Sequence, residues 1–109
     1  MTGPDVVVRR ATPADRPAIL ELLADSLGWD RDDAFADFFD WKHNRNPFGV
    51  SPAWVAVADD RIVGFRTFLR WEFEHPDGRL RHAVRAVDTA TSPEYQGRAT
   101  DTLRLMRVP

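Results

Sequence analysis

The stretch from Arg61 to Glu74 constrains the fold most, because its side chains alternate in character along its whole length. A period of two predicts a long strand with one buried face. The sequence HPDG follows at residues 75–78, where proline fixes φ and glycine can adopt a positive φ, so residues 79–91 are expected to return antiparallel. One side of the first strand should carry Val63, Phe65, Thr67, Leu69, Trp71 and Phe73, and the other side includes Arg66, Arg70 and Glu72.

The inner face of the returning strand is open to two interpretations. It carries either Leu80, Val84, Ala86 and Ala90 or the opposite set, with Ala83 and Val87.

The residues before this hairpin predict two helices between two short strands. Residues 6–10 are a β-branched run bounded by turn residues, which is typical of a strand. Residues 13–27 are expected to form a helix, because Thr12 can cap it and Asp15 can bond its free amides. Apolar spacing predicts a second helix at about 32–43, and strand signals follow at 54–58 with a tight turn at Asp59-Asp60.

Composition excludes several classes of function. The chain has 109 residues, 43% of them hydrophobic, which fits one domain over residues 1–109. Fifteen Lys and Arg against seventeen Asp and Glu are scattered without a basic block, so neither a nucleic-acid nor a membrane partner is expected. The chain has no cysteine, which excludes disulfides, thiolate catalysis and cysteine-ligated zinc. No apolar stretch is long enough to span a bilayer, and we expect a cytoplasmic protein.

The segment SPEYQGR at residues 92–98 lies between the returning strand and a helix expected at 99–107. A helix start offers unpaired amides and partial positive charge, which suit a phosphate. The order of elements, together with VDTATSPEYQGR, resembles the N-terminal part of the GNAT superfamily of acyl-CoA N-acyltransferases. The segments FFDWKHNRNPF and AWVAVADDRIVGF are similar to the second helix and the second and third strands of that family.

The resemblance implies a fold of α/β class and α+β type. Its sheet is mixed and mainly antiparallel, with element order β-α-α-β-β-β-α, and the chain is expected to be a partial domain that lacks the C-terminal strands. The implied activity is transfer of an acetyl group from acetyl-CoA to an amine on a small molecule or a peptide.

The resemblance also implies where acetyl-CoA binds. The pantetheine arm would bond the main chain at Thr89, Ala90 and Thr91. The family pattern has glycine at the position of Ala99, where a left-handed alanine costs about 1–2 kcal/mol, and glycine or alanine at that of Asp101, whose carboxylate competes for the amides. These departures and the truncation predict a damaged or reshaped site and an impaired enzyme. The pyrophosphate loop would comprise Gln96, Gly97, Arg98, Ala99, Thr100 and Asp101.

Candidate reactive and substrate-binding residues precede this loop. Asp88 lies near the strand end where the resemblance places reactive groups, and it is either a general base or a salt-bridged strand carboxylate. Trp41 and Phe48 are the candidates for an acceptor pocket. The other helix aromatics, Phe35, Phe38 and Phe39, are favoured as core. Metal-ligand spacing and a recognisable serine and acid partner are absent for the histidines, so no catalytic role is expected for His43, His75 and His82.

A second function stays open from the sequence. A missing fifth strand would leave an exposed sheet edge, which is a template for pairing. The alternative to an enzyme is therefore a non-catalytic fragment that forms a homodimer or binds a complementing fragment at this edge.

Overall fold

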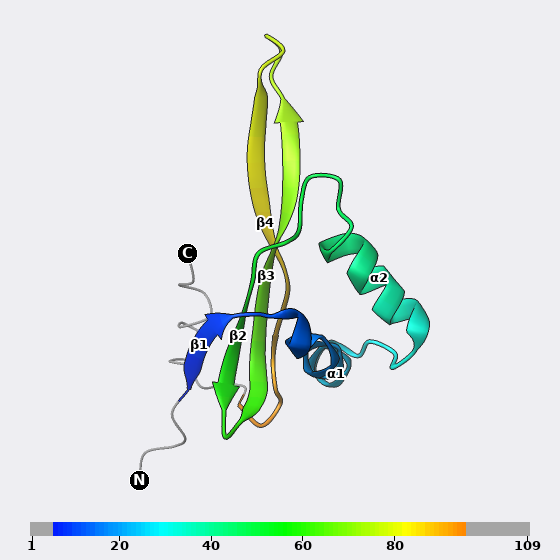
Figure 1. Ribbon diagram of the computed structural model, residues 1–109, viewed down its shortest axis with the longest axis vertical. Helices are drawn as coiled ribbons and strands as arrows, with labels where there is room; N and C mark the ends of the chain where they lie inside the picture. Colours follow the sequence, from blue (N-terminus) through cyan, green and yellow to red (C-terminus); the bar gives the residue numbers. More distant parts are fainter. Residues whose placement is uncertain (1–5, 96–109) are drawn as a thin grey trace.

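The computed structural model describes residues 6–95, in which four strands form one antiparallel sheet in the order β1-β2-β3-β4 (Figure 1). The expected loop 96–101 and helix 99–107 lie outside these residues. The remaining predicted order is confirmed. The elements are β1 (Val7–Arg10), a 3-10 turn η1 (Pro13–Asp15), α1 (Arg16–Leu27), α2 (Asp33–His43), β2 (Ala53–Ala58), β3 (Arg61–Glu74) and β4 (Leu80–Thr91).

The sheet has a buried cluster on each face, since β2 and the first half of β3 present apolar side chains on both sides. Both helices pack on one face (Figure 1). That cluster contains Ile19, Leu22 and Leu23 of α1, Phe39 of α2, and Val55, Phe65 and Ala90 of the sheet. The opposite face buries Val6, Ala56, Ala58, Val63 and Tyr95.

The prediction that Val63 and Phe65 share a face is wrong. The register passes from Val57 opposite Ile62 to Ala56 opposite Gly64, so β3 contains one extra residue at this point. Such a bulge breaks the alternation, because two residues then oppose one on the neighbouring strand. Val63 therefore joins the cluster on the face opposite Phe65.

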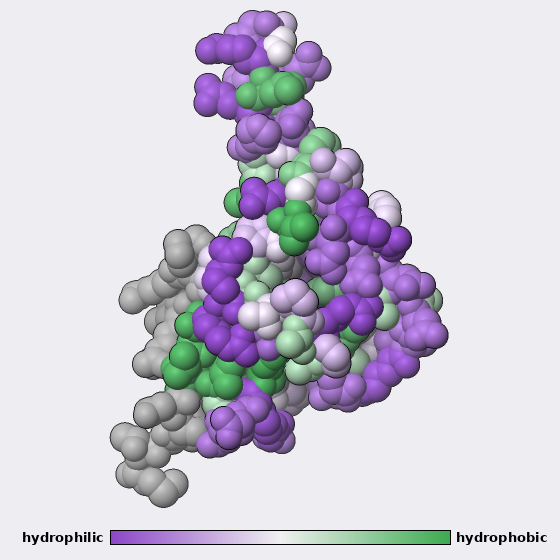
Figure 2. Space-filling model, in the orientation of Figure 1, coloured by the Kyte–Doolittle hydropathy of each residue, from purple (hydrophilic) through white to green (hydrophobic). Residues whose placement is uncertain are grey.

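The prediction of a half-buried strand fails for the outer half of β3. Beyond Thr67, whose partner is Ala53, β3 pairs only with β4, and this two-stranded arm projects past both helices (Figure 1). Figure 2 shows apolar residues on the surface of the arm. Its large apolar side chains are exposed by 42–59%, because no further strand or helix among residues 6–95 covers them: Trp71, Phe73, Leu80 and Val84.

Neither interpretation of the inner face of β4 is right. Phe65 is opposite Ala90, whereas Thr67 is opposite Val87, so β4 has one extra residue between these pairs. Asp88 lies in this bulge with a positive φ of 52°. The face of β4 that lies toward the helices therefore carries both Val87 and Ala90, which belong to different predicted sets.

The aromatic residues of α2 are only partly core. Asp32 caps the helix by accepting a hydrogen bond from the Phe35 amide at 3.0 Å. Phe39 is buried and Phe35 is half-buried, but the prediction for Phe38 is wrong, because 45% of its side chain is exposed. Within residues 6–95 no helix is both long and apolar enough to cross a membrane.

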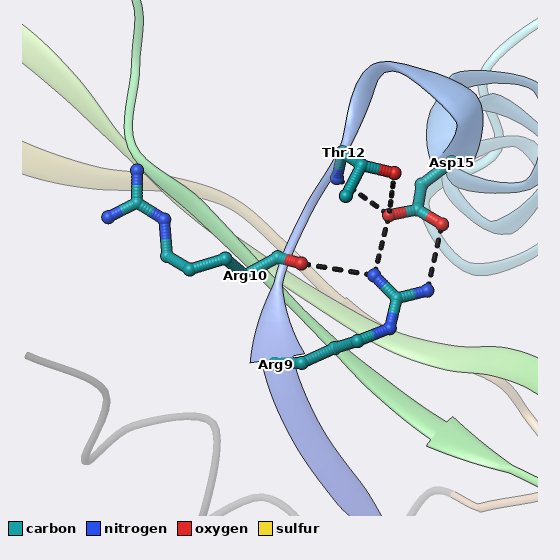
Figure 3. Close-up of polar contacts among 4 residues, drawn as sticks. All are labelled: Arg9, Arg10, Thr12 and Asp15. Carbon is teal, nitrogen blue, oxygen red and sulfur yellow. Dashed lines mark hydrogen bonds and ion pairs between the residues drawn. The ribbon is translucent and has the colours of Figure 1, made fainter.

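The connection from β1 to α1 depends on Asp15, as the sequence predicted. Its carboxylate accepts hydrogen bonds from the Thr12 amide at 2.7 Å and from two Arg9 nitrogens at 2.8 and 2.9 Å (Figure 3). The bonds from Arg9 hold the pKa of Asp15 far below its usual range, although burial opposes them. Asp15 therefore joins the strand to the start of the helix as a carboxylate.

Replacing Asp15 with asparagine is expected to lower the free energy of unfolding by about 1–2 kcal/mol, measured by urea denaturation. Most of this loss comes from the buried cap, because Arg9 is partly exposed and solvent weakens its ion pair. Asp25→Asn is the matched control: it breaks an exposed pair with Arg31 and should have an effect below about 0.5 kcal/mol. Equal losses in the two variants would contradict the proposed role of Asp15.

Candidate active site

The bulge of β4 is clamped to the last turn of α2 through Asp88. Lys42 Nζ donates a hydrogen bond to Asp88 Oδ2 at 2.9 Å, and His43 Nε2 lies 2.8 Å from the same oxygen. All three side chains are largely buried, with exposed fractions of 19% for Lys42, 4% for His43 and 10% for Asp88. Neither bond uses Asp88 Oδ1, which accepts no hydrogen bond from residues 6–95 and is available to a further donor.

The two donors determine the charge of Asp88. Burial by itself raises the pKa of the carboxyl group, but the hydrogen bonds from His43 and Lys42 together outweigh it, so the pKa of Asp88 lies below its ordinary value. Asp88 is therefore a carboxylate at neutral pH. A low pKa makes a carboxylate a weak general base and a good partner for an ammonium group.

His43 connects this carboxylate to a serine. Because ionised Asp88 can only accept hydrogen bonds, His43 Nε2 carries a proton. In the neutral ring Nδ1 is then the acceptor, and Ser51 Oγ, 2.9 Å away, donates to it. The Ser51 amide also donates to the His43 carbonyl at 2.9 Å. Ser51, His43 and Asp88 thus form a hydroxyl–imidazole–carboxylate chain that can relay a proton.

Sequence reasoning missed the role of His43. Its partners are 8 and 45 residues away in the chain, so no local spacing could identify them. The one available signal was its position in the last turn of a helix whose preceding turn carries the core residue Phe39.

Contacts with α1 and the sheet fix the position of α2. Arg16 donates two hydrogen bonds to the Asp40 carboxylate, at 2.9 and 2.7 Å. These bonds lower the pKa of Asp40 despite its partial burial. On the side of α2 that packs on the sheet, the centroid of the Phe39 ring lies 6.1 Å from that of the Phe65 ring and 4.9 Å from that of the His43 ring. The last turn of α2 is therefore held where its side chains reach the bulge.

The residues predicted to bind the pantetheine arm follow Asp88 in β4, at the edge of the described sheet. Thr89 is exposed, Ala90 is buried and Thr91 is half-buried. Ser26 of α1 donates a hydrogen bond to the Thr91 carbonyl at 2.8 Å, which fixes the end of the strand. The loop residues Gln96, Gly97, Arg98, Ala99, Thr100 and Asp101 lie outside the described residues.

Two cavities border the last turn of α2. Trp41 and Phe48, predicted to form an acceptor pocket, together line an open apolar cavity of about 250 Å³ that also contacts Lys42. The second cavity, of about 350 Å³, lies against His43 and Ser51 and extends under α1. No cluster of three or more His, Asp or Glu side chains suited to a metal ion occurs among residues 6–95.

Comparison with known proteins identifies the fold. No protein-family model matches the sequence, and no curated protein matches it. Among solved structures, a GNAT family N-acetyltransferase from Escherichia coli in complex with CoA is similar with a TM-score of 0.70 and 21% identity. That match covers 97% of this chain and 54% of the other.

Two further solved structures are similar over nearly the whole chain. A predicted acetyltransferase from Clostridium acetobutylicum with acetyl-CoA gives a TM-score of 0.69 at 16% identity, over 94% of this chain and 70% of the other. A probable N-acyltransferase of unknown function from Enterococcus faecalis gives a TM-score of 0.75 at 10% identity. That match covers 95% of this chain and 26% of the other. The chain thus spans about a quarter of the Enterococcus protein and about half of the Escherichia protein.

The antiparallel sheet with two helices on one face is thus an N-acyltransferase-like fold of α+β type. More specifically, it is a partial GNAT fold, as the sequence predicted.

Proposed function

We propose that this chain forms the acyl-CoA-binding part of an N-acetyltransferase, with acetyl-CoA as acyl donor and an amine as acceptor. The observation that carries the proposal is the bulge at Asp88, where β4 departs from its ladder with β3 at the edge of the described sheet. Thr89, Ala90 and Thr91 follow the bulge, where the resemblance places the pantetheine arm. Solved structures of similar fold include complexes with acetyl-CoA and with CoA, which supports this choice of donor.

The proposed reaction is direct transfer in a ternary complex. The neutral amine nitrogen attacks the thioester carbonyl carbon, a C–N bond forms, and the C–S bond breaks. The nitrogen loses one proton, the CoA thiolate gains one, and the products are an acetamide and CoA. Holding the two reactants together supplies much of the rate, and backbone amides of β4 would stabilise the developing oxyanion.

Asp88 is proposed to hold the acceptor amine. Its carboxylate stays charged, and Oδ1 is available to accept a hydrogen bond from the neutral acceptor amine while Oδ2 is held by Lys42 and His43. Removal of the amine proton by Asp88 itself stays a prediction; the low pKa of the group favours charge pairing over proton transfer.

Acetyl-CoA is expected to bind this chain and raise its melting temperature, since a ligand that binds only the folded state stabilises it. Calorimetric titration gives the affinity, and amide NMR shifts locate the site. The largest shifts are expected at residues 88–91 and small ones at β1, which serves as the internal control. The absence of heat and of a thermal shift at millimolar acetyl-CoA would overturn the proposal.

The exposed arm supports a second, non-catalytic function, in which the chain pairs with another copy or a complementing fragment through β4. A two-stranded ribbon is only marginally stable alone, and this one exposes Trp71, Phe73, Leu80 and Val84. Light scattering at rising concentration tests self-pairing, and a strictly monomeric protein would contradict it.

A further inference from the structure

Three exposed aromatic side chains surround the open apolar cavity at the end of α2, here called the aromatic pocket. Trp41 comes from α2, Phe48 from the loop 44–50 and Trp71 from β3, and the loop runs beside the base of the arm (Figure 1). The three residues are exposed by 42–62%. Large apolar side chains that gather at one exposed place mark a binding site. The lining residues are Trp41, Lys42, Asn46, Pro47, Phe48, Leu69, Arg70 and Trp71.

β3 gives the aromatic pocket an apolar floor. Leu69 and Trp71 alternate with Arg70, so they lie on the same face of β3 as Phe65, whose ring packs beneath the helices. The side chain of Arg70 starts from the opposite face, and its Nε donates a hydrogen bond to the Val50 carbonyl at 2.8 Å. The part of the floor that lies toward the helices is therefore formed by Leu69 and Trp71.

The charge of Lys42 is engaged outside the aromatic pocket. Its Nζ donates a hydrogen bond to Asp88 Oδ2 at 2.9 Å and lies 5.7 Å from the centroid of the Phe38 ring. Neither Asp88 nor Phe38 lines the pocket. Lys42 therefore contributes its apolar stem to the wall, while its ammonium group is held by a partner elsewhere.

Asn46 likewise has its polar atoms engaged. Its Oδ1 accepts a hydrogen bond from the Phe48 amide at 2.9 Å, and its Nδ2 donates to the Arg70 carbonyl at 3.1 Å. These bonds fix the loop that carries Phe48 and attach it to β3, so the pocket exists before any ligand binds, which reduces the entropic cost of binding. The polar atoms left on its aromatic walls are the uncharged indole N–H groups of Trp41 and Trp71.

The size and the walls of the aromatic pocket suit one ring. Its volume of about 250 Å³ exceeds the roughly 150 Å³ of an apolar cavity that binds benzene, so a phenyl ring fits. Aromatic side chains favour edge-to-face or offset contacts with a further ring. A charged group in the same place would lose its hydration without gaining a partner, which is costly.

We propose that the aromatic pocket binds an uncharged aryl group and that the acceptor is an arylalkyl amine. The ring lies between Trp41, Phe48 and Trp71, and the end of the ligand that enters the pocket carries no charge. The assignment of the ligand as an acceptor amine rests on the proposed function. Binding of the ring itself does not require acetyl-CoA.

Four probes separate the ring from the charges. Phenethylamine has a ring and an amine, 2-phenylethanol has a ring and no charge, ethylamine has no ring, and 4-(2-aminoethyl)benzoate carries a carboxylate on the ring. NMR titration measures binding, with the indole signals of Trp41 and Trp71 as reporters. Phenethylamine and 2-phenylethanol are expected to bind. Ethylamine and the benzoate are expected to bind at least about tenfold more weakly than phenethylamine. Equal binding of phenethylamine and either weak probe would overturn the inference.

Phe48→Ser and Phe73→Ser form a matched pair of variants. Both residues are exposed, so both variants are expected to fold, but only Phe48 lines the aromatic pocket. Phe48→Ser should weaken phenethylamine and 2-phenylethanol at least about fivefold, because it removes one wall of the pocket. Phe73→Ser should leave both affinities unchanged. Equal effects of the two substitutions would contradict the location of the ring.

The alternative occupant is an apolar side chain from a second copy of this chain. A second copy would compete with the probe, so phenethylamine would then bind more weakly as the protein concentration rises. An affinity that does not depend on protein concentration is expected. A dependence on concentration would assign the pocket to self-association and overturn the inference.

Separate titrations of the unaltered protein keep this inference apart from the proposed function. Acetyl-CoA and 2-phenylethanol are each added alone. Binding of 2-phenylethanol without binding of acetyl-CoA would overturn only the proposed function. Binding of acetyl-CoA without binding of 2-phenylethanol would overturn only the role of the aromatic pocket.

Discussion

Replacing Asp88 with alanine is expected to lower the free energy of unfolding by about 3 kcal/mol. The change leaves Lys42 and His43 largely buried without their common acceptor, and a buried charge without a partner is costly. Alanine must also adopt the positive φ of 52° at this position, which adds strain. Urea unfolding at neutral pH measures the loss.

The matched control is Asp60→Ala. Asp60 has a similar φ of 60° but is exposed in the turn between β2 and β3, so its replacement adds comparable backbone strain and disturbs no buried partner. A cost of about 1 kcal/mol is expected there. Asp88→Asn, which tolerates the backbone conformation and loses only the charge, should fall between the two. Equal losses of unfolding free energy in Asp88→Ala and Asp60→Ala would show that the contacts of Asp88 with Lys42 and His43 contribute nothing to stability.

The effect of Asp88→Ala should also depend on pH. The pKa of Asp88 is lower in the folded than in the unfolded protein, so the carboxylate contributes stability that is fully present above its unfolded pKa of about 4. That contribution is lost as the pH falls through the lower folded value. The difference in the free energy of unfolding between the unaltered protein and Asp88→Ala should therefore be constant from pH 7 to about pH 5. It should shrink below about pH 4. A difference that stayed constant into acid would contradict an ionic role for Asp88.

Local sequence signals predicted the elements well, because the residues that determine them are close together in the chain. The contact of Asp15 with the Thr12 amide spans three residues, and the turn 75–78 needs only its own proline and glycine. The partial GNAT fold was likewise predictable, since it depends on the order of such elements. Trp41 and Phe48 line one cavity beside the loop that follows α2, and their role in binding an acceptor stays a prediction.

The bulges were not predictable from alternation. One extra residue in β3 moves Val63 to the opposite face from Phe65, and one extra residue in β4 joins Val87 to Ala90. A period-two pattern assumes a regular ladder, and the one local signal in β3 is Gly64 beside the extra residue, because glycine inside a strand often marks a bulge. The clamp on Asp88 was missed for a related reason: its contact with His43 spans 45 residues, and only the folded sheet brings the two together.

Replacing Phe65 with alanine is expected to cost about 4 kcal/mol, which is a large part of the stability of a domain of this size. Phe65 is 1% exposed and packs against Phe39 of α2 on the helix-side face. Its opposite residue in the sheet is Ala90, immediately beyond the bulge. The ring therefore packs against α2 and lies opposite β4, the two elements that Asp88 joins. Its loss leaves a cavity between them.

The control on the same strand is Phe73→Ala, which removes the same atoms from a side chain that is 59% exposed and should cost less than about 1 kcal/mol. Phe65→Leu keeps most of the volume, so it should fold even where the alanine variant does not, and it should lose an intermediate amount. Because Phe65 supports the bulge from below, acetyl-CoA affinity should fall in Phe65→Leu and stay unchanged in Phe73→Ala. Equal stability of the two alanine variants would mean that the helix-side core does not hold α2 against β4, and the site would then need another support.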